Sequence, residues 1–536
     1  MSRSPCDSNG DETASFEVFP YDIDRLKDLL CRKSLATPIL INRKSHINYF
    51  KNYFEALVAK TIVVENEYVD RDYLDDFAGY YVRCFKEYRR LCSRLHFFDQ
   101  RIDNAQFDEM LRNGGNSEII DKLKNAYLGF VVVKPLPQTV IGRTCLKTYA
   151  DDGGRRHFPI TRDYSCNLFG LDLSVDTLAF QEQDNVVAAC ATSALWSIFQ
   201  GTGRQFQHSI PSPVEITRTA ASNILSESRA IPSQGLTSHQ LAHAIREVGL
   251  EPLKENARNP LIFKTTLYSY LRGGIPIFLG LDLWDISEDG HVLFGKHGVA
   301  ITGYSLGEDE PSSINGVFLK ALRIDKIYVH DDQIGPFARM VFDDVKIKNP
   351  EISGDNSEMS SLSTSWLGKS GREGSVRAVP DFIIMPLYHK IRIPFSAVLQ
   401  RIISFDRILN SLSALTEGIA PLQWDIFLTT VSDLKSDILT SQHVPGEDYR
   451  KKLLLTRMSR FIWRAIADHD GDPVIEVVFD ATDIRQGAIM ICAIEYDMVV
   501  SGAIRTLMEI PDFEAIISNQ LCWTIFDWFK GRPMPV

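Results

Sequence analysis

The spacing of hydrophobic residues changes along the chain and divides it into segments. Over residues 19–128 the apolar positions mostly recur at helical spacing; within residues 21–30, for example, Ile23, Leu26 and Leu30 fall on one stripe. We therefore predict a helical N-terminal domain over residues 19–128. The polar segment before it, residues 1–18, is predicted to be a disordered tail.

Between residues 129 and 180 the period shortens to that of strands. Residues 130–133 and 139–144 are rich in β-branched residues, and Pro135 and Pro137 separate them. This pattern predicts a strand-rich lead-in over residues 129–180.

Residues 181–387 combine one apolar helical run with strands that are apolar on both faces. The run begins at Cys190, and the segments 275–281 and 298–302 are typical of strands buried within a sheet. Residues 349–377 are rich in Ser and Gly, which indicates a mobile loop or linker. Residues 388–536 alternate helices with a hairpin, in which 474–479 and 488–492 are the strands, and so predict an α/β C-terminal domain. The fold class expected for the whole chain is α+β.

Composition excludes several classes of protein. The 536 residues carry a net charge of −11, so we expect no broad basic surface for nucleic acid or for an anionic membrane, although a local patch is compatible with this charge. No run of about eighteen apolar residues predicts a membrane span, and the polar N-terminus does not resemble a secretory signal. The nine cysteines show no zinc-ligand spacing. We therefore expect a cytoplasmic protein without a metal or cofactor.

Cys190 is the first candidate for chemistry. A thiol attacks a carbonyl carbon as the thiolate, which a helix N-terminus and a neighbouring imidazolium both favour. Helical periodicity starts at Cys190, which would place it in the first turn of a buried helix. The alternative is a small buried residue, as free cysteines often are.

Two later segments supply possible partners for this cysteine. His297 opens the apolar strand 298–302, where a polar ring needs a polar partner because an unpaired one is costly to bury. Asp331 and Asp332 end the segment 328–332. Strand alternation places Asp331 and Asp332 on opposite faces, so either could orient His297, and Asp331 is the preferred choice; the alternative for both is a strand-ending turn.

The sequences ACATSALW at residues 189–196, GGIPIFLG at 273–280, KHGVAITGY at 296–304 and IYVHDD at 327–332 occur in an order that resembles papain-like cysteine peptidases. The resemblance extends over about residues 180–340 and is greatest to the bacterial branch that includes the double-glycine peptidases processing bacteriocin leaders. It implies a helix bearing the cysteine packed on an antiparallel sheet bearing the histidine and aspartate. By position it makes Cys190 the nucleophile, His297 the general base and acid, and Asp331 the residue that orients the imidazole.

The chain departs from the family pattern at several positions. The family's oxyanion glutamine stands shortly before the nucleophile, whereas Gln183 is seven residues upstream and Gln181 nine. Gln183 is the preferred candidate for polarising the scissile carbonyl, against the alternative of an exposed loop glutamine. Ala191 replaces the usual glycine after the cysteine, and an insertion around residues 307–313 lengthens the interval between His297 and Asp331.

Other histidines give weaker signals. His239 and His243 have the spacing of a zinc helix, but Gln240 stands where a metalloprotease needs glutamate, so a structural helix is favoured. His291 could compete with His297 for the role of base, although it precedes the strand in a loop.

Three functions follow as hypotheses. The first is hydrolysis of a peptide or isopeptide bond in a protein or peptide substrate through a Cys190 thioester. The second is acyl transfer or deamidation by the same three residues, and the third is an inactive papain-like domain that only binds. The N- and C-terminal domains are candidate surfaces for a regulatory protein partner.

Overall fold

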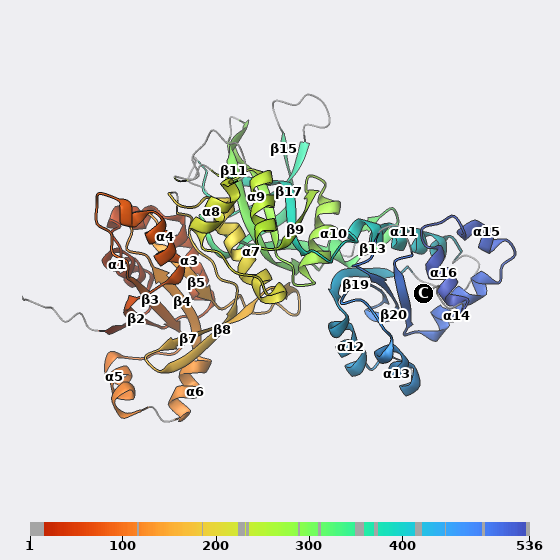
Figure 1. The fold of residues 1–536 in the computed structure, drawn as a ribbon, viewed down its shortest axis with the longest axis horizontal. Helices are drawn as coiled ribbons and strands as arrows, with labels where there is room; N and C mark the ends of the chain where they lie inside the picture. Colours follow the sequence, from red (N-terminus) through yellow and green to blue (C-terminus); the bar gives the residue numbers. More distant parts are fainter. Residues whose placement is uncertain are drawn as a thin grey trace, which may run out of the picture.

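The computed structural model describes residues 15–114, 117–184, 186–222, 231, 235–287, 290–308, 312–348, 358–368, 374–412, 421–444, 446–484 and 488–531. Its sheets have five, eight, six and two strands, and their strand pairs are antiparallel except for one parallel pair in the six-stranded sheet. Figure 1 shows three regions side by side: an N-terminal one in red and orange, a central one from yellow to cyan, and a C-terminal one in blue. The class is therefore α+β, as predicted.

The N-terminal region is built on a sheet in the order β1-β2-β3-β4-β5. Its strands are β1 (Phe16–Pro20), β2 (Thr61–Tyr68), β3 (Cys92–Phe98), β4 (Tyr127–Val133) and β5 (Ile141–Leu146). Its helices are α1 (Ile23–Lys33), α2 (Pro38–Arg43), α3 (Ser45–Ala56), α4 (Arg71–Gly79), the 3-10 helix η1 (Tyr81–Arg83), α5 (Asn104–Asn113) and α6 (Ser117–Asn125).

The prediction of a helical domain over residues 19–128 is wrong, because β2 and β3 are central strands of this sheet. All seven residues of β3 are buried, so the strand lacks the alternation that would have distinguished it from a buried helix. The predicted tail over residues 1–18 is also wrong at its end, since β1 begins at Phe16; residues 1–14 lie outside the described residues.

The segment 129–180 is rich in strands, as predicted, but these strands join different sheets. β4 and β5 complete the N-terminal sheet, β6 (Arg156–His157) pairs with β11 of the central sheet, and β7 (Arg162–Leu168) and β8 (Leu171–Thr177) form a separate hairpin. The lead-in therefore connects the N-terminal and central regions.

The central sheet runs in the order β10-β11-β14-β15-β16-β17-β9. Because β10 (Ile277–Ser287) pairs with both β11 (Gly290–Leu306) and β17 (Val376–Tyr388), six of these strands close on themselves. The others are β9 (Leu250–Asn256), β14 (Ile324–Asp331), β15 (Gly335–Lys348) and β16 (Glu358–Ser363). The helix α7 (Cys190–Phe206) packs on β10, β11 and β14, and the accompanying helices are α8 (Pro213–Ala221), α9 (Ser238–Glu247) and α10 (Pro260–Leu271).

The predicted linker over residues 349–377 is wrong where the structure describes it. Residues 358–363 form β16, which pairs with β15 and β17, and Leu362 is buried between them. Backbone pairing within the sheet stabilises this polar strand, a contribution that composition does not reveal. Residues 349–357 and 369–373 lie outside the described residues.

The C-terminal region contains a sheet in the order β12-β13-β18-β19-β20-β21. Its strands are β12 (Ser313–Ile314), β13 (Val317–Leu319), β18 (Gln423–Thr430), β19 (Phe461–His469), β20 (Asp472–Asp480) and β21 (Met490–Glu495). Its helices are α11 (Phe395–Leu412), α12 (Val431–Thr440), α13 (Glu447–Leu455), α14 (Met498–Met508), α15 (Phe513–Ile517) and α16 (Trp523–Phe529). The predicted hairpin is confirmed, since β20 and β21 pair antiparallel.

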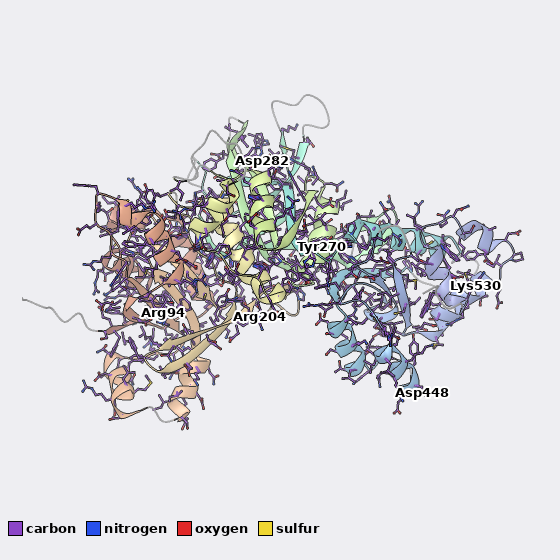
Figure 2. The ribbon with its side chains drawn as sticks, viewed as in Figure 1. Arg94, Arg204, Tyr270, Asp282, Asp448 and Lys530 are labelled. Carbon is purple, nitrogen blue, oxygen red and sulfur yellow. The ribbon has the colours of Figure 1, made fainter. Side chains whose placement is uncertain are left out.

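The central and C-terminal regions share structure across the predicted boundary at residue 388. The short strand β13, which follows the insertion noted in the sequence, pairs in parallel with β18, and the 3-10 helix η2 (Lys320–Arg323) leads from it into β14. Tyr270 lies at this junction (Figure 2), where its hydroxyl accepts a hydrogen bond from the Phe395 backbone at 3.2 Å and its ring lies 5.2 Å from that of Trp463. None of the helices that the structure describes is long and apolar enough to cross a membrane.

Candidate active site

Cys190 is the first residue of α7, as the hydrophobic pattern predicted. The preceding Ala189 is the N-cap residue and has no side chain that could cap the helix, so the positive end of the helix dipole is left facing the cysteine. Cys190 is half-buried, whereas the next ten residues of the helix are buried. The thiol therefore stands at the accessible start of a helix whose next ten residues are buried.

His297 lies on β11 opposite Leu281 of β10 and is buried. The residue after it is Gly298, and a Cβ atom at this position would lie 2.6 Å from the Phe278 ring and 3.6 Å from the Ala191 Cα. The absence of a side chain at Gly298 therefore lets β11 approach the first turn of α7 closely. This approach brings His297 to the cysteine.

One imidazole joins the thiol to a carboxylate. The Cys190 side chain is a hydrogen-bonding neighbour of His297, and His297 Nε2 lies 3.0 Å from Asp331 Oδ1. Asp332 Oδ1 is farther from the same nitrogen, at 3.7 Å. Because Nε2 faces Asp331, Nδ1 is the nitrogen left for the thiol. The structure thus brings together Cys190, His297 and Asp331, with Asp331 as the nearer of the two aspartates.

The charges of this cluster are mutually stabilised. Burial lowers the pKa of His297. The negative charge of Asp331 and the hydrogen bonds of His297 with Asp331 and Cys190 outweigh burial and raise this pKa well above its ordinary value. Burial raises the pKa of Asp331, yet His297 and the donors Trp366 and Gln333 bring it below its ordinary value. The arrangement favours an imidazolium beside a carboxylate.

Trp366 is a functional neighbour that sequence reasoning missed. Its indole Nε1 donates to Asp331 Oδ2 at 2.7 Å, and its ring stands edge-on to His297 with centroids 5.0 Å apart. It is the only aromatic residue in the polar stretch 349–377, and that isolation was the available signal. The indole covers the His297–Asp331 pair and fixes the carboxylate.

Asp332 has a different environment from Asp331. Its Oδ2 accepts a hydrogen bond from Gln333 Nε2 at 2.8 Å, and its backbone oxygen lies 2.9 Å from His46 Nε2. Its Oδ1 is buried and has no hydrogen-bond partner among the described residues. Burial therefore raises the pKa of Asp332 to about 6, although the nearby His297 lowers it.

Gln183 lies on the aspartate side of the cluster. Its Oε1 accepts from Gln333 Nε2 at 3.5 Å, and its backbone oxygen accepts from Thr139. Gln181 is buried, and its Nε2 has no hydrogen-bond partner among the described residues. The contacts therefore connect Gln183 to the site through Gln333.

The N-terminal region braces the segments that carry the site. Lys44 forms an ion pair with Glu182, and Tyr81 donates to Asp184 at 2.6 Å, both just upstream of Cys190. Gly335 (φ +155°) begins β15 directly after the turn of the aspartates, and a Cβ there would lie 2.3 Å from the ring of Tyr49 on α3. These long-range contacts had no signal in the sequence.

His297, Asp331 and Asp332 also form a group whose ligand atoms all lie within 4.8 Å of one another, and which could hold a metal ion. The hydrogen bond between His297 and Asp331 would have to be displaced for such an ion to bind.

His239 is exposed on α9, while His243 lies 3.8 Å from Glu247. His291 Nδ1 accepts a hydrogen bond from the Lys348 backbone at 2.9 Å, which directs this ring toward β15.

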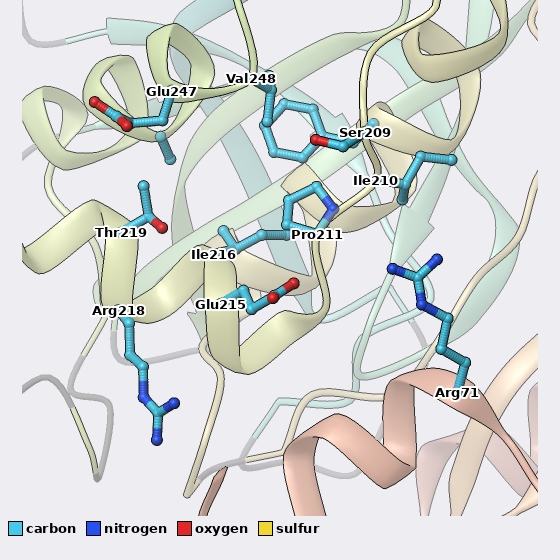
Figure 3. Close-up of a pocket in the computed structure, with 12 residues that line it drawn as sticks. Arg71, Ser209, Ile210, Pro211, Glu215, Ile216, Arg218, Thr219, Glu247 and Val248 are labelled. Atoms are coloured by element: carbon cyan, nitrogen blue, oxygen red, sulfur yellow. The ribbon is translucent and has the colours of Figure 1, made fainter. Parts of the chain in front are cut away.

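A separate pocket of about 480 Å³ lies beside the middle of α7 (Figure 3). Arg71 of α4 approaches it from the N-terminal region, while Glu215, Ile216 and Arg218 line it from α8. Cys190 is not among its lining residues, so this pocket is separate from the cluster around His297.

No known protein family model matches this chain, and no curated protein is similar to it at a significant level.

Proposed function

We propose that the protein is a cysteine-dependent hydrolase that cleaves a peptide or isopeptide bond through a thioester on Cys190. The observation that supports this most directly is the single imidazole of His297 between the thiol of Cys190 and the carboxylate of Asp331. A nucleophilic thiol needs an adjacent base and an accessible position. His297 of β11 is the base adjacent to Cys190, and Cys190 is only half-buried at the start of α7.

In the proposed reaction the Cys190 sulfur attacks the carbonyl carbon while His297 holds the proton taken from the thiol. Backbone N–H groups at the start of α7 would stabilise the oxyanion that forms. His297 then gives its proton to the leaving amine as the C–N bond breaks, leaving a thioester. Water, deprotonated by the same imidazole, attacks this thioester and releases the carboxylic acid and the thiol.

The residues around His297 have distinct supporting roles in this proposal. Asp331 stabilises the imidazolium and fixes the tautomer that presents Nδ1 to the thiol. Trp366 holds the second oxygen of Asp331 and excludes water from the pair, which strengthens the electrostatic interaction. Gln183 is the proposed side-chain donor to the oxyanion.

The proposal is tested first by the reactivity of the thiol. A brief treatment with iodoacetamide near pH 6 should alkylate Cys190 much faster than Cys84, which is also half-buried and so serves as the matched control. Mass spectrometry of the labelled peptides measures both rates. Equal or slower labelling of Cys190 would reject its role as nucleophile.

The fate of the thioester distinguishes hydrolase from transferase. With peptide substrates and abundant primary amine, a hydrolase yields mainly free carboxylate, whereas a transferase yields mainly amide. We expect the carboxylate. Failure to trap any acyl group on Cys190 across broad peptide libraries would instead indicate a module that only binds.

The glutamine assignment has its own comparison. Gln183→Ala should lower kcat by roughly tenfold to a hundredfold if its amide stabilises the oxyanion, with little change in KM. Gln181→Ala serves as the matched variant two residues away. A larger loss of kcat in Gln181→Ala would transfer the role to Gln181, whose buried Nε2 lacks a hydrogen-bond partner among the described residues.

A further inference from the structure

Residues 82–90, which comprise the end of η1 and most of the loop that leads to β3, concentrate positive charge on a chain whose net charge is −11. Its cationic side chains are all exposed, and the loop has one acidic residue, Glu87. Within the part of the chain that the structure describes, none of these cations forms an ion pair; Lys86 alone has a contact of another kind, lying 5.6 Å from the Tyr88 ring centre. The four cations are Arg83, Lys86, Arg89 and Arg90. We call residues 82–90 the basic loop.

Apolar side chains project from the same loop. Phe85 is completely exposed, at 106% of its reference area, and Val82 is 58% exposed. Leaving an aromatic ring fully in water forgoes the free energy that its burial would provide. Exposed apolar side chains surrounded by polar groups are typical of surfaces that contact a partner.

The backbone of the basic loop is held to the protein while its tip projects. Tyr73 donates to the Arg89 backbone oxygen at 2.8 Å, the Tyr88 ring packs 5.1 Å from that of Tyr81, and the Cys84 N–H donates to the Tyr81 oxygen. These contacts fix both sides of the tip. The cations and Phe85 are therefore presented together in a stable arrangement.

The shape and chemistry of the loop discriminate between anionic partners. Binding of single-stranded nucleic acid uses several exposed rings on which bases stack, but Tyr88 is packed on Tyr81, so Phe85 alone offers a free face. An acidic peptide would need a groove to receive it, whereas Val82 and Phe85 point outward. A lipid bilayer with anionic headgroups accepts a convex apolar tip and attracts the cations around it.

We propose that the basic loop docks the protein on an anionic membrane surface, with Phe85 and Val82 entering the interface and Arg83, Lys86, Arg89 and Arg90 facing the headgroups. This surface is independent of the proposed catalysis. Tyr81, the residue before the basic loop, nevertheless links it to the segment that leads into the cysteine site, because it donates to Asp184, six residues before Cys190. Docking would hold that site in a defined orientation to the bilayer.

Co-sedimentation of the full chain with lipid vesicles tests the proposal. Vesicles of phosphatidylcholine mixed with phosphatidylserine should bind the protein, binding should weaken as salt is raised, and pure phosphatidylcholine should bind little. The double variant Arg83→Gln/Arg90→Gln should bind at least about tenfold more weakly than the original protein. Phe85→Ala should bind severalfold more weakly.

Matched controls come from α13. Lys451→Gln/Lys452→Gln removes two exposed cations, and Leu455→Ala removes an apolar side chain that is 71% exposed; both should bind like the original protein. Circular dichroism checks that each variant is folded. Equal binding to neutral and anionic vesicles, or undiminished binding by the basic-loop variants, would overturn the proposal. So would saturable binding of a poly-glutamate peptide or single-stranded RNA in place of vesicles.

Discussion

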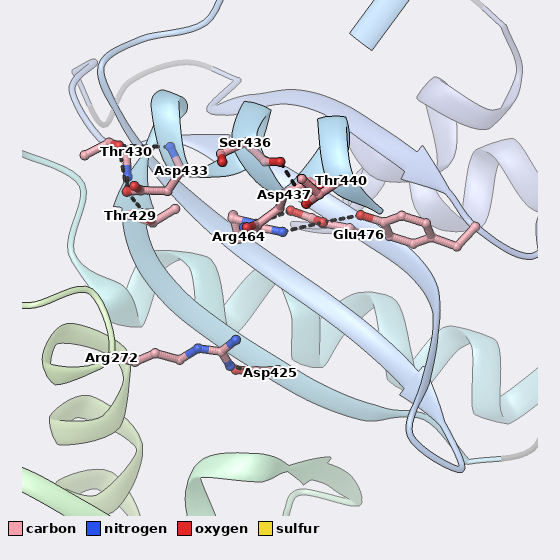
Figure 4. A network of polar contacts seen from close by, with 11 residues as sticks. Arg272, Asp425, Thr429, Thr430, Asp433, Ser436, Asp437, Thr440, Arg464 and Glu476 are labelled. Carbon is pink, nitrogen blue, oxygen red and sulfur yellow. Dashed lines mark hydrogen bonds and ion pairs between the residues drawn. The ribbon is translucent and has the colours of Figure 1, made fainter. Parts of the chain in front are cut away.

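Two buried clusters of charge in this molecule differ in how completely their polar atoms are paired. In the C-terminal region Arg464 binds Glu476 through two nitrogens, at 2.5 and 3.1 Å, and Tyr496 donates to Glu476 at 2.7 Å (Figure 4). Asp437 accepts from a third nitrogen of Arg464 at 2.5 Å. Both carboxylate oxygens of Glu476 therefore have donors, and the cluster is closed.

The cluster around His297 is incompletely paired by the same measure. Asp332 Oδ1 is buried without a hydrogen-bond partner among the described residues, and the Cys190 thiol at the other side of the ring is half-buried. Fully paired networks of charge stabilise a single arrangement, while a cluster with an open position and a shared proton can change its protonation during a reaction. We therefore expect the first cluster to stabilise the fold, and the second to serve the proposed reaction.

The largest expected difference concerns thiol reactivity. His297→Ala should slow alkylation of Cys190 near pH 6 by roughly a hundredfold or more, because the imidazole that accepts the thiol proton in the proposed reaction is lost. Glu476→Gln, in the closed cluster, should leave this rate unchanged. Iodoacetamide labelling followed by mass spectrometry measures both, and a similar rate in both variants would remove the distinction between the clusters.

The closed cluster should instead control stability. Glu476→Ala leaves the buried Arg464 without its main partner and should lower the free energy of unfolding by about 3–5 kcal/mol. Asp437 is 62% exposed, so Asp437→Ala should cost under about 1 kcal/mol. Urea unfolding measures both. Equal costs would show that burial of the pair does not determine its contribution.

Asp331→Asn should destabilise the protein by about 3 kcal/mol, within a limited pH window. The contribution of His297, whose pKa is raised, is complete below about pH 6.5 and is lost as pH rises through the raised value. The contribution of Asp331, whose pKa is lowered, is complete above about pH 4 and is lost as pH falls. Urea unfolding should therefore show the greatest cost between about pH 4 and 6.5. A cost independent of pH would contradict the ion pair.

Asp332→Asn should have the opposite sign. Burial raises the pKa of Asp332 to about 6, so its ionised form destabilises the folded state above this pH, and the penalty disappears as the group is protonated on acidification. The variant should gain on the order of 1–2 kcal/mol of stability above pH 6 and nothing below about pH 4. Loss of stability at neutral pH would show that this carboxylate is needed beside His297.

The smallest expected effect comes from the indole. Trp366→Phe keeps a ring against His297 but removes the donor to Asp331, and should lower the rate of Cys190 alkylation by about threefold to tenfold. Phe294→Leu is the matched control, because that ring touches Trp366 at 6.0 Å without bonding the carboxylate. An equal loss in both variants would assign Trp366 a packing role alone.

The sequence by itself determined the order and local setting of the candidate site. Helical periodicity beginning at Cys190, the doubly apolar strand after His297 and the strand ending at Asp331 are local patterns, because each depends on residues close in the chain. The strands of residues 129–180 and the hairpin of β20 and β21 were predicted for the same reason.

Tertiary structure decided which residues meet. Alternation placed Asp331 and Asp332 on opposite faces, but an irregularity in the pairing of β14 with β15 after Val329 and the turn that follows bring both within 4 Å of His297 Nε2. Trp366, His46 and the strands of the N-terminal sheet likewise depend on contacts between residues far apart in the chain. The spacing of hydrophobic residues predicts which face of a helix or strand is buried. Which residues that face contacts is decided only when strands and helices that are distant in the chain pack together.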